Sequence, residues 1–366
     1  MMKKGICLLM ALWLLLGGLA LAEENVLDLR GKSFSGLEAV CKAIDEAGEI
    51  DTVDLTNVIL SLEIRSQLVK KYPDIHFRWT LDVFGVKVTT EDTVLNLANK
   101  YVGDRDKLCQ YLDCLPNLEQ VLMYNNYTTH AERERMYYGY PDIFFGWKFT
   151  MENGKYGIRT ESTAFSTLKD GEPPYWTNAN TSWVQFCPDL KALDLGHNAI
   201  SDLSFLEKGP KLKVLILACN PISDLTSLAS QTELEYLELF SNKITDISPL
   251  ASLTQLKDLN LCNNQITDLS PLYDLPNIER IWLTNNPGIT QEQKDALRAH
   301  QPDAEIVYES NGATGALLDE NGEIIPNTGW RHHKRFPVVW TIFNKGAYLP
   351  WDADLTGLYP GDWQME

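Results

Sequence analysis

The side chains that most often perform catalysis or bind metals show no recognisable spacing in this sequence. None of the histidines lies in a zinc-binding pattern such as HExxH; they are His76, His130, His197, His300, His332 and His333. The chain also lacks the Gly-x-Ser-x-Gly elbow of hydrolases, a phosphate-binding glycine loop, a dinucleotide fingerprint and a Cys-x-x-Cys pair. We therefore expect no metal, no cofactor and no catalytic site of these kinds.

Carboxylates are the one reactive group present in large number, with 50 Asp and Glu residues. Asp194 lies close to His197, a pairing that suits acid–base chemistry. His197, however, stands at a variable position of the repeat described below, which favours a role on a loop surface. A glycosidase-like carboxylate pair in the C-terminal tail is the one enzymatic alternative that the sequence leaves open.

The overall charge restricts the partners. The formal net charge is −18, whereas nucleic acids and anionic lipids attract proteins with an excess of Lys and Arg. The only dense basic run covers residues 331–335 and is too short to reverse this balance. The composition thus argues against nucleic acid and anionic membranes as partners.

The first 22 residues have the three-part layout of a secretory signal peptide. Lys3 and Lys4 precede an apolar run over residues 6–16, and the small-residue site ending at Ala22 follows. The run is shorter than the ~20 residues that cross a bilayer, so cleavage after Ala22 is favoured over an uncleaved anchor. We expect a secreted or cell-surface protein with no membrane span after cleavage.

A repeat of 22 residues dominates the second half of the chain. It aligns two sets of residues: Leu190, Leu212, Leu234, Leu256 and Ile278, and Asn198, Asn220, Asn242, Asn264 and Asn286. Each LxxLxL segment predicts a short strand whose leucines enter a core that neighbouring repeats complete. This predicts an α/β leucine-rich-repeat solenoid, with a curved parallel β-sheet and with short helices, 3-10 turns and loops on the convex side.

The polar residues after each strand have a structural explanation. The repeated Asn lies where the chain turns, and its amide can bind backbone groups of adjacent turns that would otherwise be buried unpaired. An Asp later in each repeat can cap the short helical turn that follows; these are Asp202, Asp224, Asp246 and Asp268. These carboxylates therefore need no catalytic role.

The block from Cys187 to about Thr290 resembles the 22-residue leucine-rich repeats of bacterial internalins, down to the Asn-x-Ile-Ser/Thr-Asp-Leu/Ile phrase. Internalin-like proteins are surface or secreted binders of host or cell-surface proteins, so the resemblance implies binding and not catalysis. It covers under a third of the chain. The anchoring modules familiar in that family are not evident, which leaves the mode of surface attachment open.

The N-terminal part, residues 23–186, carries a looser duplication. The segment from Tyr72 to Trp79 returns as Tyr140 to Trp147, and in each copy a Pro-Asp turn follows a predicted amphipathic helix. We interpret this part as irregular helix–strand repeats that extend the same sheet and cap its N-terminal end, with a separate α/β domain as the alternative. The same helix, turn and strand order closes the regular region, residues 187–309.

The tail, residues 310–366, follows no repeat. It is rich in Gly, Pro and aromatic residues, including Trp330, Trp340, Trp351 and Trp363. This spacing has no helical period and predicts short strands and turns. The tail is either a small β-rich module or a C-terminal cap that wraps onto the repeats.

Removal of the leader leaves six cysteines: Cys41, Cys109, Cys114, Cys187, Cys219 and Cys262. Cys219 and Cys262 fall on strands two repeats apart, or about 10 Å, which exceeds the reach of a disulfide. Cys109 and Cys114 are close enough in sequence to pair. Cys187 is expected to fill the core.

Residues between the inward leucines face the concave side of the sheet. The predicted binding residues on this face are Val214, Ile216, Tyr236, Glu238, Phe240, Asp258, Asn260, Arg280 and Trp282. Exposed aromatic residues among a few charges are typical of a binding hot spot. Coverage by the protein's own tail is the competing interpretation.

The sequence thus predicts a non-catalytic protein that recognises a protein partner through its concave face. Five strands make a face only about 20–25 Å wide, so a tight complex would need the N-terminal strands as well. Glycan or cell-wall binding through the tryptophans of the tail is the alternative. A hydrolase with its site in the tail is the least favoured reading.

Overall fold

The structure is a computed structural model that describes residues 24–151, 156–168, 176–312, 314–326 and 328–358. The predicted signal peptide and Trp363 lie outside the described residues. No helix in the described part of the chain is long and apolar enough to cross a membrane. The chain forms two compact units, residues 1–122 and 123–366.

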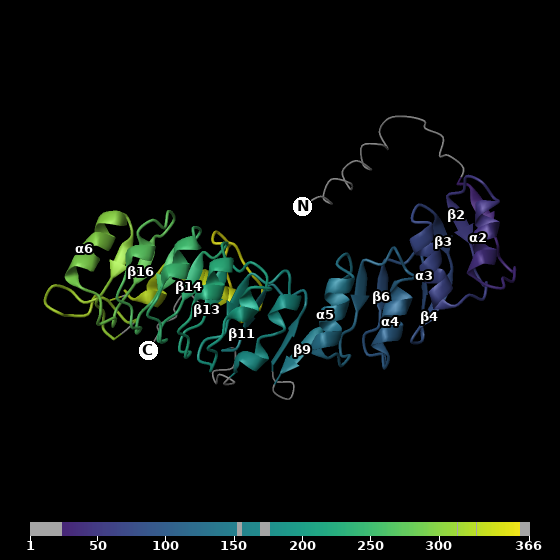
Figure 1. Ribbon diagram of the computed structural model, residues 1–366. Helices are drawn as coiled ribbons and strands as arrows, with labels where there is room; N and C mark the ends of the chain where they lie inside the picture. Colours follow the sequence, from purple (N-terminus) through teal and green to yellow (C-terminus); the bar gives the residue numbers. More distant parts are fainter. Residues whose placement is uncertain (1–23, 152–155, 169–175, 313, 327, 359–366) are drawn as a thin grey trace. The chain divides into compact units, whose positions relative to one another are not determined.

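The first unit alternates short strands with helices (Figure 1). Its elements in chain order are β1 (Val26–Asp28), α2 (Leu37–Asp45), β2 (Thr52–Asp54), α3 (Leu62–Lys71), β3 (His76–Arg78), β4 (Thr80–Val83), β5 (Val86–Thr89), β6 (Val94–Asn96), α4 (Arg105–Leu112) and β7 (Gln120–Leu122). β1, β2 and β3 form a parallel sheet of their own, β4 and β5 form an antiparallel hairpin, and β6 pairs with β7. The prediction that the N-terminal strands extend the sheet of the regular repeats is therefore wrong for these strands, because the hairpin interrupts the parallel order.

The second unit contains the regular repeats. It begins with α5 (His130–Gly139), β8 (Phe144–Gly146) and the hairpin of β9 (Lys148–Met151) and β10 (Tyr156–Arg159). A parallel sheet of seven strands follows: β11 (Ala164–Ser166), β12 (Ala192–Asp194), β13 (Val214–Ile216), β14 (Tyr236–Glu238), β15 (Asp258–Asn260), β16 (Arg280–Trp282) and β17 (Glu305–Val307). The predicted leucine-rich-repeat solenoid is confirmed, and its sheet includes one strand, β11, from the irregular region.

The duplication seen in the N-terminal part has a common structure in both copies. Trp79 and Trp147 are buried, and each stacks on a phenylalanine two positions earlier, with ring centroids 5.3 Å apart for Phe77–Trp79 and 5.2 Å apart for Phe145–Trp147. A hairpin follows each tryptophan. The order of helix, Pro-Asp turn and strand returns at α6 (Gln291–His300) and β17, as predicted.

The regular repeats bury their leucines completely and turn through short 3-10 helices. These are η3 (Val184–Phe186), η4 (Ser204–Leu206), η5 (Thr226–Ser230), η6 (Ser248–Ser252) and η7 (Ser270–Leu272), with η2 (Asn178–Asn180) before them. The predicted Asp caps are confirmed, because each Asp accepts a hydrogen bond from the backbone N–H two residues later, at 2.8 Å for Asp246 and Ser248.

The repeated asparagines form the predicted ladder. The side chain of Asn220 donates to the carbonyl of Leu195 at 2.9 Å and accepts from the N–H of Ile200 at 2.9 Å, so one amide bridges two repeats. Asn242, Asn264 and Asn286 repeat this pattern. The residue before each ladder Asn, from His197 to Asn285, has a left-handed backbone with φ between 54° and 59°.

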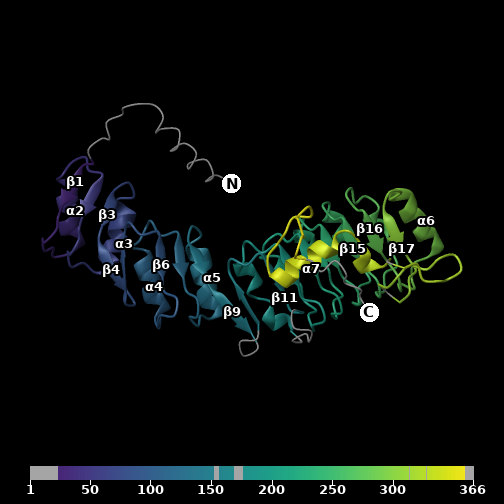
Figure 2. The same cartoon turned by 180° about the vertical axis from the view of Figure 1, so that it is seen from behind.

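The tail contains a helix, so the prediction of a β-rich segment is wrong. η8 (Trp330–His332) precedes α7 (Phe336–Lys345), which ends at Gly346 with a φ of 68°. The apolar run of α7 has one buried face, formed by Val338, Val339 and Ile342, and Pro337 starts its first turn. The tail wraps onto the repeats and lies over the face of the sheet (Figure 2).

None of the six cysteines after the leader forms a disulfide in the structure. Cys187 is fully buried at the entrance to the regular repeats, as predicted. The thiol of Cys114 lies 3.2 Å from the backbone carbonyls of Leu62 and Gln110 and forms no bond with Cys109.

Candidate functional site

The parallel register aligns the concave-face residues in rows that run across the strands. One row runs through Ala192, Val214, Tyr236, Asp258 and Arg280, and the next through Asp194, Ile216, Glu238, Asn260 and Trp282. Neighbouring members of a row are one strand apart, or about 4.8 Å. The geometry of the predicted surface is therefore present.

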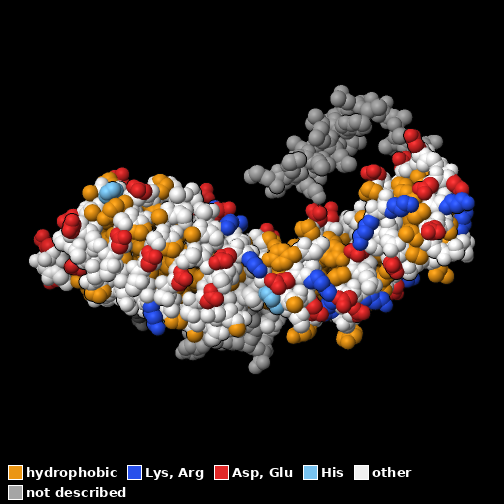
Figure 3. Space-filling view, viewed as in Figure 1, with side chains coloured by type: hydrophobic (Ala, Val, Ile, Leu, Met, Phe, Trp, Pro, Cys, Tyr) orange, Lys and Arg blue, Asp and Glu red, His pale blue; other side chains and the backbone are white. Residues whose placement is uncertain are grey.

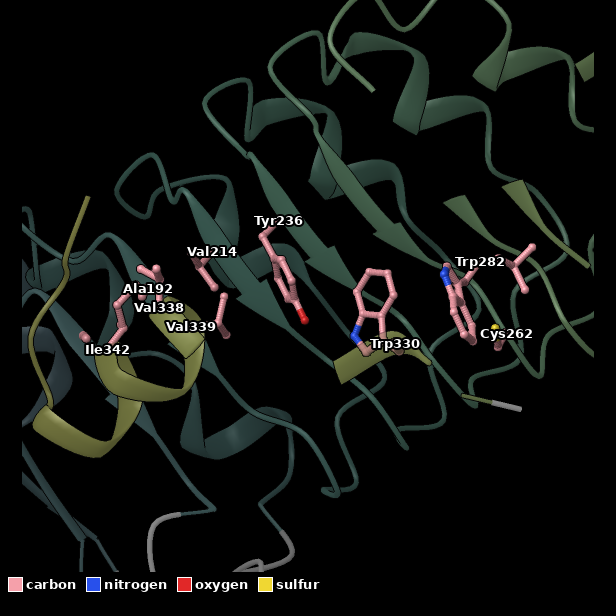
Figure 4. Close-up of a cluster of buried hydrophobic side chains, with 11 residues drawn as sticks. Ala192, Val214, Tyr236, Cys262, Trp282, Trp330, Val338, Val339 and Ile342 are labelled. Atoms are coloured by element: carbon pink, nitrogen blue, oxygen red, sulfur yellow. The ribbon is translucent and has the colours of Figure 1, made fainter. Parts of the chain in front are cut away.

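The predicted exposure of this surface is wrong. Ile216 and Phe240 keep partial exposure, but the structure buries the other candidates: Val214, Tyr236, Glu238, Asp258, Asn260, Arg280 and Trp282. Trp330 of the tail lies between Tyr236 and Trp282, with ring centroids 5.5 Å and 6.2 Å away (Figure 4). The apolar side chains on the concave face, which the repeats themselves leave exposed, thus form a core with residues of the tail.

Helix α7 completes this second core. Its residues Val338, Val339 and Ile342 pack with Ala192 and Val214 on one side of the sheet (Figure 4). Burial of an aliphatic side chain of this size stabilises a fold by about 1.5–3 kcal/mol. Together with Trp330, the helix makes the tail an integral part of the repeat unit.

At β15 and β16 the tail also neutralises buried charge. Asp258 is fully buried and accepts hydrogen bonds from Arg280 at 2.9 Å and from Arg335 of the tail at 2.8 Å. Arg280 in turn donates to the backbone carbonyl of Trp330 at 2.8 Å, and its guanidinium lies 3.9 Å from the centre of that indole ring. We call this group, Asp258, Arg280, Trp330 and Arg335, the sealed end of the concave face.

His333 borders the sealed end as a neutral side chain. Burial lowers the pKa of its imidazole to about 4, although the nearby Asp258 carboxylate opposes this effect. The 3.7 Å approach of His333 Nδ1 to Asp258 is therefore not an ion pair at neutral pH. The same nitrogen faces the backbone N–H of Arg335 at 3.5 Å, which suits an unprotonated acceptor.

The other end of the concave face is hollow. A cavity of about 490 Å³ lies between β11–β14 and the tail. The sheet contributes Asp194, Ile216, Glu238 and Phe240 to its wall, and the tail contributes Trp340, Phe343 and Arg331. We call it the concave-face cavity.

Two buried carboxylates line the concave-face cavity. Asp194 accepts hydrogen bonds from the Ser166 hydroxyl at 2.7 Å and the Gly196 N–H at 3.0 Å, and Glu238 Oε2 accepts one from the Trp330 indole N–H at 3.1 Å. Burial raises the pKa of both carboxyls, and these hydrogen bonds and the positive charge of Arg331 offset only part of the rise. The ionised forms are thus poorly compensated by the protein itself.

Sequence reasoning selected Ile216, Glu238 and Phe240 of this cavity but missed its other lining residues. Asp194 stands in the same row as Glu238 and was the available signal. His197 is exposed, as its interpretation as loop surface predicted, and it also borders the cavity. Arg331 and Trp340 come from the tail, and nothing in their local spacing indicates the cavity. No group of three or more potential metal ligands occurs among the described residues.

Comparison with known proteins agrees with the repeat geometry. Residues 188–230, 232–273 and 254–295 match the family model of leucine-rich repeats in two copies. The matched residues, under a third of the chain, are leucine-rich repeats, and their 22-residue register is similar to that of internalins. Comparison with curated proteins gives no match.

Three solved structures illustrate the likeness. Internalin C2 from Listeria monocytogenes is 25% identical, with 60% of this chain and 92% of that chain covered and a TM-score of 0.32. Internalin F from the same organism is 20% identical, with 78% and 81% covered and a TM-score of 0.31. A chain of the Drosophila Toll–Spatzle complex is 15% identical, with 72% and 27% covered and a TM-score of 0.27.

Proposed function

We propose that this protein is a secreted or surface-exposed, non-catalytic binding protein whose protein partner docks over the concave-face cavity. The observation that carries this proposal is the cavity itself, which remains open on a sheet face that the tail otherwise fills. Concave cavities with apolar walls and a few polar groups are the usual form of a binding site.

On this proposal the predicted binding residues fall into two groups. Ile216, Glu238 and Phe240 line the cavity and are available to a partner. Other candidates contact the tail and hold it in place, namely Val214, Tyr236, Asp258, Arg280 and Trp282. The docking site is therefore narrower than the whole concave face and lies at β12–β14.

A partner must also contact the rim of the cavity, because a stable interface takes about 800 Å² from each protein. Exposed residues next to the cavity include His197 on the sheet side and Asn344 on α7. The net charge of −18 favours a basic partner. Figure 3 shows Asp and Glu side chains spread over the face of the repeats that points away from α7.

Capture from separate surface-protein and polysaccharide fractions tests the proposal. The double variant I216A/F240A removes two partly exposed cavity side chains, and the control I59A/Y101A removes two hydrophobic side chains that are 95% and 91% exposed elsewhere. We expect the parent and the control to retain a protein ligand and the cavity variant to lose it, with all three equally folded by circular dichroism.

Other outcomes select the alternatives. Retention by the cavity variant at the parent level would refute docking at this cavity. Capture of polysaccharide alone would favour glycan binding through the tail, although Trp330 is only 1% exposed and cannot stack on a sugar.

A further inference from the structure

We propose that the group inserted into the concave-face cavity is cationic, namely a lysine or arginine side chain of the protein partner. This inference rests on the proposed function and names the chemistry of the same site. It follows from a comparison of the cationic partners of the buried carboxylates.

The described residues include four buried carboxylates: Asp194, Glu235, Glu238 and Asp258. Those outside the cavity each have two cationic partners. Glu235 pairs with Lys213 at 2.8 Å and Lys257 at 2.6 Å, and Asp258 pairs with Arg280 and Arg335. A buried carboxylate is stable only when charge and hydrogen bonds compensate the loss of water.

The two carboxylates that line the cavity, Asp194 and Glu238, have no cationic partner within ion-pair distance among the described residues. No Lys, Arg or His nitrogen of the described residues lies within 4.0 Å of Asp194 or Glu238. Glu238 also has an unused oxygen: Tyr236 and Trp330 both donate to Oε2, and no described residue donates to Oε1. A cation from outside the chain would supply the missing compensation.

Arg331 does not remove this need. It lines the same cavity and interacts with other groups, one of them the Phe336 ring at 5.7 Å. Its single positive charge faces two carboxylates, so the cavity stays net negative when both are ionised. An anionic group is therefore disfavoured as the occupant.

The walls suit a long side chain with a charged end. Ile216 separates Asp194 from Glu238 in the row, and the two acidic residues lie two strands apart, or about 10 Å. Phe240, Trp340 and Phe343 add aromatic surface to the cavity. The methylene stem of Lys or Arg packs on apolar and aromatic surface while its head binds carboxylate, and aromatic faces attract the same cations.

The test uses small probes, because it needs no knowledge of the partner. N-acetyl-lysine N-methylamide and N-acetyl-arginine N-methylamide carry the cation, and N-acetyl-norleucine N-methylamide is the neutral comparator of the lysine probe. Binding is followed by the indole N–H signals of Trp330 and Trp340 in NMR titrations. We expect at least one cationic probe to bind the parent at least tenfold more tightly than the norleucine probe.

Two matched substitutions locate the effect. Glu238→Gln keeps the shape and an acceptor for Trp330, and it should weaken binding of the cationic probe at least tenfold. The control Glu233→Gln removes an exposed carboxylate and should leave binding unchanged. Equal binding of cationic and neutral probes to the parent overturns the inference whether or not a variant folds, as does unchanged binding by a folded E238Q protein.

The result separates this inference from the proposed function. If I216A/F240A abolishes partner capture but the cationic probes show no preference, the docking site stands and the cationic occupant does not. If the probes bind through Glu238 while capture is unaffected by I216A/F240A, the cavity takes a cation and docking of a protein there is wrong.

Discussion

At β15 the tail brings a second guanidinium to a buried carboxylate, whereas at β12 and β14 no described residue of the tail brings a cation within ion-pair distance of Asp194 or Glu238. Both regions belong to one sheet and are covered by one segment of chain. The difference shows that the tail compensates buried charge where it closes the sheet. Where it leaves a cavity, its described residues compensate the buried charge only in part.

This contrast distinguishes buried charges that stabilise the fold from buried charges that are kept for binding. Uncompensated buried charge lowers stability, and proteins retain it mostly at sites that bind or react. The sealed end should therefore respond to substitution as a core does, and the cavity end should not.

The largest loss should follow Asp258→Ala at the sealed end. The substitution leaves Arg280 without its carboxylate and removes one partner of Arg335, both of which are buried. Removing one partner of a buried ion pair costs about 3–5 kcal/mol, measured as the free energy of unfolding in urea. The control Asp246→Ala removes only an exposed turn cap and should cost about 1 kcal/mol. Equal losses for the two variants would show that the sealed end is not a charged core.

Trp330→Phe should lower the free energy of unfolding by an intermediate amount, because Trp330 contacts both the sealed end and the concave-face cavity. The substitution keeps an aromatic ring between Tyr236 and Trp282 but removes the indole N–H that binds Glu238. Loss of a hydrogen bond to a buried acceptor costs about 1–3 kcal/mol. Trp340→Phe, at a partly exposed position, is the control and should cost less than 1 kcal/mol. A smaller loss for Trp330 than for Trp340 would contradict its placement.

Acid should weaken the sealed end through His333. The folded protein holds the imidazole neutral, with a pKa lowered from 6.5 to about 4 by burial. Protonation therefore favours the unfolded chain, and this contribution to stability is complete above pH 6.5 and is lost as the pH falls towards about 4. Asp258, Arg280, Lys334 and Arg335 surround the ring and set this balance.

The measurement compares the parent with His333→Gln between pH 7.5 and pH 5. Because the ring is partly exposed, we expect the parent to lose about 1 kcal/mol more than the variant, roughly half of what the pKa difference would give over this pH range. The variant is needed because Asp194 and Glu238, with raised pKa values, shift stability in the opposite direction with pH. Parallel pH profiles for the two proteins would exclude His333 as the titrating group.

The repeats could be predicted from the sequence because their signals are local. The spacing of 22 residues determines the strands, the Asn ladder and the Asp caps, and each is present. The sequence also identified Tyr236 and Trp282 as side chains that the repeats themselves leave without a core. Their partner could not be predicted, because Trp330 lies in a segment that follows no repeat.

The cavity was beyond prediction for the same reason. Glu238 binds Trp330 across a separation of 92 residues, and no pattern along the chain records that contact. α7 was missed because its apolar residues meet the sheet face only in the folded protein. One consequence is practical: replacing Tyr236, Phe240 and Trp282 together, a natural test of an exposed face, would disrupt a core instead.

Glu238→Gln should have the smallest effect on stability, and with the opposite sign. It removes a negative charge that burial disfavours, while the amide oxygen can still accept from the Trp330 indole. We expect the free energy of unfolding to stay unchanged or to rise by up to about 1 kcal/mol. Glu235→Gln, the matched substitution at a paired carboxylate, should instead lower it by about 1 kcal/mol through loss of its two lysine partners. A loss at Glu238 as large as that at Glu235 would mean that the protein already compensates this charge, and the cavity would then have no need of a cation from a partner.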